Sequence, residues 1–149
     1  MSNILQNTYG RRMPIGAAGM AATEHGWDAD TRQAEGTIVF GRACSKGDED
    51  DGVVQGGSLF VGVSIRDITL DHDTADQYEE GDNVAIMTRG DIWVVVSGAV
   101  EAQTRASYNT STGLIGASGT AIAGSYFKTS ADDGELAILR LNDGSDVTT

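Results

Sequence analysis

Short apolar runs separated by turn residues dominate the chain from Gly36 onward. The first two runs cover residues 37–44 and 59–65, and both are rich in the β-branched and aromatic residues that strands prefer. The charged segment 46–52 lies between them and predicts a surface loop, and the acidic segment 71–82 predicts another. The pattern therefore indicates short strands joined by exposed turns.

The clearest single element is a predicted hairpin. Two apolar runs, 84–87 and 92–96, flank the dipeptide Arg89-Gly90. A tight two-residue turn needs a residue that tolerates positive φ, and Gly90 supplies one. With Asp91, the same residues spell the tripeptide that integrins bind, but a hairpin turn explains them without any role in adhesion.

Alternation within residues 92–96 places apolar side chains on both faces of the second predicted strand. Trp93 and Val95 lie on the face opposite to residues 92, 94 and 96, which are Ile, Val and Val. A strand that is apolar on both faces is either central in a sheet or covered on its outside by a partner. The sequence leaves these two interpretations open.

The last part of the chain continues the pattern of short strands. Residues 135–141 alternate with period 2; they could also form a short helix, but the neighbouring turn residues favour a strand. About eight short strands spaced by turns indicate an all-β sandwich or barrel. The further runs are 106–108, 114–115 and 121–127, with turn signals at 109–113 and 131–134.

Residues 1–35 differ from the rest because they show no strong period of 2 or 3.6. The single proline, Pro14, favours an extended conformation at Met13. We therefore predict an extended N-terminal arm, 1–35, followed by a β-sandwich or barrel domain, 36–149. At about 3.3 Å per residue, such an arm reaches roughly 100 Å.

Charge and composition narrow the classes of partner. The chain has 149 residues, enough for one domain with a core, and a formal net charge of −12. Its ten Lys and Arg residues are dispersed, which argues against binding nucleic acid or an anionic membrane surface. No secretory signal or membrane-spanning run is present, so we expect synthesis and folding in a cytoplasm.

The residues that could carry chemistry do not form a recognisable site. The two histidines, His25 and His72, lack the His-x-His pair of cupins, and the acidic segment 70–76 has Asp76 where a calcium loop needs Gly. Cys44, the single cysteine, lies in an apolar run and is expected to be a buried structural thiol. No nucleophile elbow or phosphate-binding loop occurs. We therefore predict no enzyme activity, no catalytic residues, no cofactor and no metal, with weak cation binding at 70–76 as the alternative.

Residues 36–142 resemble the structural cement proteins of tailed phages. The resemblance rests on the order of four segments: IVFGRA at 38–43, LFVGVS at 59–64, EGDNVAIMTRGDIWV at 80–94 and YNTSTG at 108–113. It implies a jelly-roll-like β-sandwich or barrel, with a β-tulip-like decoration fold as the alternative. It also implies a homo-oligomer, a dimer in preference to a trimer, that binds the major capsid protein across joints between its subunits.

A physical role follows from this resemblance. A protein that contacts two capsomers must be removed before they separate, so it stabilises the shell against internal DNA pressure. The net charge of −12 favours the outer capsid surface of the virion, because packaged DNA repels it. We expect the arm to bind capsid or a second copy through residues of interface-enriched types, although it could instead wrap its own domain. Its candidate anchors are Tyr9, Arg11, Arg12, Met13, Ile15, Met20 and Trp27.

Three other function classes compete with this interpretation. The closest is another virion β module of a tail, baseplate or fibre tip. A carbohydrate-binding module would need an exposed aromatic platform, and only two tryptophans are available. A small enzyme would need a convergent polar pocket that the sequence does not indicate.

Overall fold

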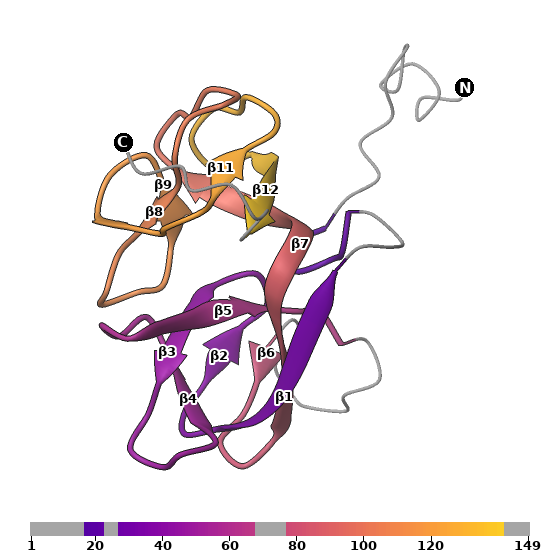
Figure 1. Cartoon of the computed structure of the whole chain (residues 1–149), viewed down its shortest axis with the longest axis vertical. Helices are drawn as coiled ribbons and strands as arrows, with labels where there is room; N and C mark the ends of the chain where they lie inside the picture. Colours follow the sequence, from indigo (N-terminus) through magenta and orange to yellow (C-terminus); the bar gives the residue numbers. More distant parts are fainter. Residues whose placement is uncertain (1–16, 23–26, 68–76, 142–149) are drawn as a thin grey trace, which may run out of the picture.

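The computed structural model describes residues 17–22, 27–67 and 77–141, and these residues form strands and turns without a helix (Figure 1). The all-β prediction is confirmed; the specifically jelly-roll arrangement stays a prediction. The strands are β1 (Asp28–Ala34), β2 (Ile38–Val39), β3 (Ala43–Lys46), β4 (Gly52–Gln55), β5 (Phe60–Ser64), β6 (Gln77–Tyr78), β7 (Asn83–Ser97), β8 (Ser107–Tyr108), β9 (Ile115–Gly116), β10 (Thr120–Ala121), β11 (Tyr126–Phe127) and β12 (Leu136–Leu141).

Five strands close into a barrel, which is the lower part of the molecule in Figure 1. Their order is β1–β4–β3–β5–β7, and β7 pairs back onto β1. β1 runs parallel to β4 and antiparallel to β7. A separate pair, β2 with β6, contributes the fully buried Ile38 and Tyr78. Closure satisfies the backbone hydrogen bonds that an open sheet leaves at its edges.

The remaining strands form an upper region around the second half of β7 (Figure 1). β12 pairs with β7 on one side and with β11 on its other side. β9 runs parallel to the end of β7 and continues the sheet to β8 and β10. The outermost strands, β10 and β11, contain two residues each, so this region offers only short edges.

The predicted hairpin at Arg89-Gly90 is wrong, because β7 is one continuous strand of 15 residues. Its first half pairs with β1, and from Gly90 onward it pairs with β12. Each apolar run thus finds its own partner strand, which removes the need for a turn. Gly90 is required for another reason: its φ is +127°, and a Cβ there would lie 2.2 Å from the Cβ of Trp27.

The other predicted strands are partly confirmed. Runs 59–65 and 135–141 contain β5 and β12, and β12 alternates between buried and half-buried residues as expected. Run 37–44 is divided into β2 and β3 by a turn in which Gly41 has a φ of +78°. Run 121–127 is divided between β10 and β11. β1 and β4 were not predicted as strands.

Two clusters of buried side chains hold the fold together. One lies within the barrel and consists of Ala34, Ile38, Phe40, Cys44, Val53, Tyr78, Val84 and Ile86. The other joins the barrel to the upper region: barrel residues Ala43, Val63 and Met87 pack with upper-region residues such as Ile92, Phe127 and Leu139. The shared cluster makes the two regions one packed unit, because burial of its apolar surface requires both.

Candidate docking surfaces

The segment 17–22 is fixed to β7 by backbone hydrogen bonds at the junction between the two regions. The Gly19 amide donates to the Trp93 carbonyl at 2.8 Å, and the Trp93 amide donates to the Met20 carbonyl at 2.9 Å. On the barrel side, the Arg66 amide donates to the Gly19 carbonyl at 2.7 Å. These bonds fix residues 19 and 20 to both regions of the molecule.

Two glycines make this attachment possible. Gly19 and Gly41 have φ values of +82° and +78°, and their backbones touch each other. A Cβ on Gly41 would lie 2.7 Å from the Gly19 nitrogen, and one on Gly19 would lie 2.9 Å from the Arg66 nitrogen. A side chain at either position would force the two backbone segments apart, so glycine is needed at both.

The structure describes two of the seven candidate anchors in the predicted arm. Met20 and Trp27 are both half-buried; Met20 lies in the segment fixed to β7, and Trp27 packs against the shared core. Residues 28–34 form β1 of the barrel. These residues pair with β4 and β7, while the arm at 1–35, its role and the domain boundary at 35 stay predictions. Tyr9, Arg11, Arg12, Met13 and Ile15 lie outside the described residues.

The outer face of β7 and β12 is a second candidate surface. Three cross-strand pairs share it: Asp91 with Arg140, Trp93 with Ile138, and Val95 with Leu136. Trp93, Leu136 and Ile138 are half-buried, and Val95 is 37% exposed. The opposite faces of both strands are buried in the shared core. We use the name outer face for Asp91, Trp93, Val95, Leu136, Ile138 and Arg140, together with the adjacent Lys128.

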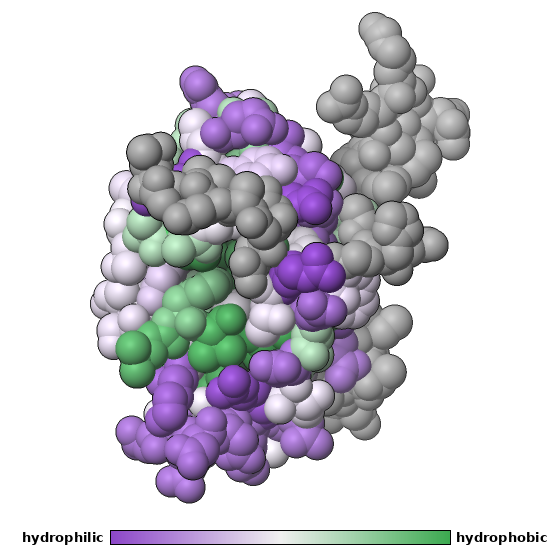
Figure 2. Space-filling view, in the orientation of Figure 1, coloured by the Kyte–Doolittle hydropathy of each residue, from purple (hydrophilic) through white to green (hydrophobic). Residues whose placement is uncertain are grey.

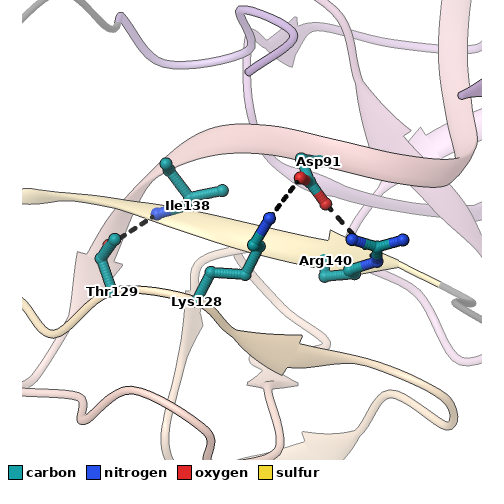
Figure 3. Close-up of polar contacts among 5 residues, drawn as sticks. All are labelled: Asp91, Lys128, Thr129, Ile138 and Arg140. Carbon is teal, nitrogen blue, oxygen red and sulfur yellow. Dashed lines mark hydrogen bonds and ion pairs between the residues drawn. The ribbon is translucent and has the colours of Figure 1, made fainter. Parts of the chain in front are cut away.

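A charged cluster forms one end of the outer face (Figure 3). The Asp91 side chain is only 3% exposed, and one of its oxygens accepts a hydrogen bond from Lys128 Nζ at 2.9 Å. Arg140 Nε lies 3.7 Å from the other oxygen, which is too long for a hydrogen bond. Among the described residues, neither that oxygen nor Arg140 Nε has a hydrogen-bond partner. The cluster contains two cations for one carboxylate.

The end of the barrel opposite the upper region is hydrophilic (Figure 2, bottom). Here the loop between β3 and β4 contains the exposed residues Asp48, Glu49, Asp50 and Asp51. The Glu35 carboxylate accepts hydrogen bonds from the Asp48 and Glu49 amides at 2.8 and 2.9 Å. These two bonds lower the pKa of Glu35, and they hold the loop in place.

Leu59 is the most exposed large apolar residue in the described part of the chain, at 64%. It precedes β5, whose first residue, Phe60, packs against Tyr108 with ring centroids 5.4 Å apart. Figure 2 shows hydrophobic surface gathered at mid-height on this face, alongside β5. An isolated exposed leucine is common on protein surfaces, so Leu59 alone does not mark a docking surface.

Cys44, the single cysteine of the chain, is buried. Burial raises the pKa of the Cys44 thiol to about 12, so it is not a ready nucleophile, and the predicted buried thiol is confirmed. No three metal-binding side chains gather among these residues, and no helix there is long and apolar enough to cross a membrane. His25, His72 and most of the acidic segment 70–76 lie outside the described residues.

The chain is similar to known proteins of phage particles. Residues 5–142 match the family described as Structural cement protein (E217 gp24/Pam3 gp6). Two solved structures share the fold, each at 13% sequence identity. The capsid of Myoviridae phage XM1 matches with a TM-score of 0.66 over 85% of this chain and 90% of that chain. The head fiber gp8.5 N base of bacteriophage phi29 matches with a TM-score of 0.51 over 83% and 100%. No curated protein matches the chain.

Together, the fold and the matches define a class, the all-β structural proteins of the phage virion. More particularly, the chain belongs to the phage structural cement protein family. The family match begins at residue 5, so it extends the resemblance seen in the sequence to most of the N-terminal segment. Membership implies association with capsid proteins.

Sequence reasoning missed several residues of these surfaces. The attachment through Gly19 and Gly41 depends on two distant segments meeting, and nothing in the local sequence signals that. Lys128 and Arg140 reach Asp91 only because β7 is continuous. The alternation at 92–96 and 135–141 did point to the outer face, because it places apolar residues on the solvent side of both strands.

Proposed function

We propose that this chain is a non-enzymatic cement protein that binds the outside of a phage head across joints between major capsid proteins. Bound there, it stabilises the shell against the pressure of packaged DNA. The observation that carries the proposal is the attachment of Gly19 and Met20 to β7 of a closed body. We infer that residues 1–16 and the body bind separate sites on the shell, which increases the effective concentration of the second contact.

The N-terminal segment is the proposed connector. Residues 1–16 contain Arg11 and Arg12 and no acidic residue, in a chain whose net charge is −12. They also contain the candidate anchors Tyr9, Met13 and Ile15. Tyrosine and methionine are among the residue types enriched at interfaces. We propose that this segment is extended and adds as a strand to a sheet edge of the shell protein through backbone hydrogen bonds.

The charge of the body supports an outer location. Four acidic residues project from the β3–β4 loop, and the whole molecule is repelled by a polyanion. Copies on the shell can also pair with one another, as a homodimer in preference to a trimer, so that each contact is repeated by symmetry.

Deletion of residues 2–16 tests the proposal, because it leaves the attachment at 17–22 and all of β1 in place. We expect the full chain to bind purified heads that lack it, with density on the outer surface in electron cryomicroscopy and greater resistance of filled heads to heating. The truncated chain should retain its unfolding temperature but lose at least about tenfold in affinity. Density only inside the shell, or no binding by the full chain, would overturn the cement role. Equal affinity of the two chains would overturn the role of the segment alone.

A further inference from the structure

We propose that the outer face of β7 and β12 is a docking surface for a segment of the shell protein that carries carboxylates beside apolar side chains. This inference rests on the proposed function, and it adds a second contact, separate from the N-terminal segment, together with the chemistry of its partner.

The first argument is the apolar character of a solvent-side sheet face. Trp93 and Val95 lie opposite Ile138 and Leu136, so four large apolar side chains form one continuous row. A strand with one face in the core normally has polar residues on its other face. None of these four residues is fully buried in the chain alone, and Val95 is 37% exposed. A partner that covers the row gains the free energy of burying it.

The second argument is the charge at the end of the row. Lys128 and Arg140 are 35% and 36% exposed, and they share the single buried carboxylate of Asp91. One positive charge is therefore not neutralised within the cluster. Arg140 Nε makes no hydrogen bond among the described residues, and the side chain is exposed enough for an incoming carboxylate to reach it. Arginine binds carboxylates with two parallel hydrogen bonds, which gives both strength and direction.

The net positive charge of the Asp91, Lys128 and Arg140 cluster favours a carboxylate-bearing partner over a second copy of this chain. A second copy that presents the same face offers only its own Asp91 carboxylate, which is 3% exposed and already bonded to Lys128, so it cannot neutralise the extra cation. A segment with carboxylates complements the cluster, and its apolar neighbours complement the row. Trp93 and Arg140 are of the residue types that dominate binding energy at interfaces, which makes them the expected centre of the contact.

The test uses two substitutions at one site that differ in charge. Val95→Glu and Val95→Lys remove the same apolar contact, both at an exposed position, so their loss of packing is similar. We expect Val95→Glu to bind purified heads at least about tenfold more weakly than Val95→Lys, and the difference to shrink at high salt. Leu59→Glu and Leu59→Lys are the matched control at the exposed leucine of the barrel, and these two should bind alike.

Each result has a defined meaning. Binding of all four variants with the affinity of the original chain would overturn the docking surface and leave the cement role intact. No binding by the original chain would instead overturn the cement role. If the Val95 pair changes the oligomeric state of the free chain in sedimentation velocity, the face is an interface between copies. If the pair changes only the unfolding temperature, the face contributes to the stability of the chain itself and does not bind the shell. Either of the last two results would also overturn the inference.

Discussion

The barrel and the upper region achieve stability in different ways. The barrel closes its backbone hydrogen bonds in a ring of five strands and has its own buried cluster, which includes Ile38 and Tyr78. In the upper region, β8 to β11 contain two residues each, and turns make up much of the rest. The side chains of the upper region are buried largely in the cluster that it shares with the barrel.

This difference indicates which part of the molecule can vary. Strand ladders constrain the sequence of the barrel through close backbone approach, whereas a turn-rich region tolerates change wherever the shared core is kept. The candidate surfaces agree with this division. The outer face lies in the upper region, and residues 17–22 are attached where that region meets the barrel.

The largest expected effect comes from the shared core. Phe127→Ala removes a fully buried ring of the upper region and should lower the free energy of unfolding by about 3–5 kcal/mol. Because the cluster spans both regions, we expect one cooperative transition in urea, followed by tryptophan fluorescence and circular dichroism. Two separate transitions would show that the upper region unfolds alone. Leu59→Ala is the exposed control and should change stability by no more than about 0.5 kcal/mol.

A smaller effect is expected from close backbone packing in the barrel. A Cβ on Gly62 would lie 2.3 Å from the Met87 carbonyl oxygen on β7, so Gly62→Ala should cost about 2–3 kcal/mol. Gly134, in the upper region, has a φ of +83° with open space around it, so Gly134→Ala should cost about 1 kcal/mol. Thermal unfolding of the two variants measures the contrast, and equal costs would contradict it.

Two carboxylates that pair with cations differ in burial: Asp91 is buried and Asp28 is exposed. Asp91→Asn weakens a hydrogen bond from a charged donor at a buried site, and it should cost about 1–3 kcal/mol. Asp28→Asn affects an exposed pair with Arg89 in the barrel and should cost less than about 1 kcal/mol. Chemical denaturation of both variants is the measurement. A greater loss at Asp28 would show that burial does not decide the strength of these pairs.

The smallest effect concerns pH and the β3–β4 loop. The folded pKa of Glu35 lies below its usual value of 4.5, mainly because the carboxylate accepts hydrogen bonds from the Glu49 and Asp48 amides. Near pH 4.5 the folded chain therefore binds fewer protons than the unfolded chain. The stabilisation by the Glu35 carboxylate is complete above the unfolded pKa and is lost as the pH falls through the folded pKa. The advantage in unfolding temperature over Glu35→Gln should shrink on acidification. An advantage that stays constant down to about pH 3 would contradict this.

The sequence predicted the strands that bury alternate side chains. β5 and β12 were found because apolar residues and turn signals define them. β1 was missed because its residues are mostly exposed and polar, and its pairing with β7 and β4 depends on backbone groups that carry no sequence signal. The turn at Arg89-Gly90 was wrong because a glycine suited to a hairpin equally suits close approach of Trp27.

The candidate surfaces were predicted only in outline. The apolar residues on the solvent side of 92–96 and 136–140 follow from period 2, so a partner-covered face was a possible interpretation. The Asp91 cluster brings together residues 91, 128 and 140, and such a contact depends on tertiary structure. The attachment of residues 17–22 likewise depends on Gly41 and Arg66, which are far away in the sequence.

The continuity of β7 has a mechanical consequence. Tension applied to the upper region along this strand passes directly into the barrel through covalent backbone, without crossing a loop. There it acts lengthwise on the six residue pairs between β7 and β1. A pull in that direction strains all the ladder's hydrogen bonds at once, whereas a sideways pull opens them one after another. The molecule should therefore resist stretching along β7 far better than prying apart across it.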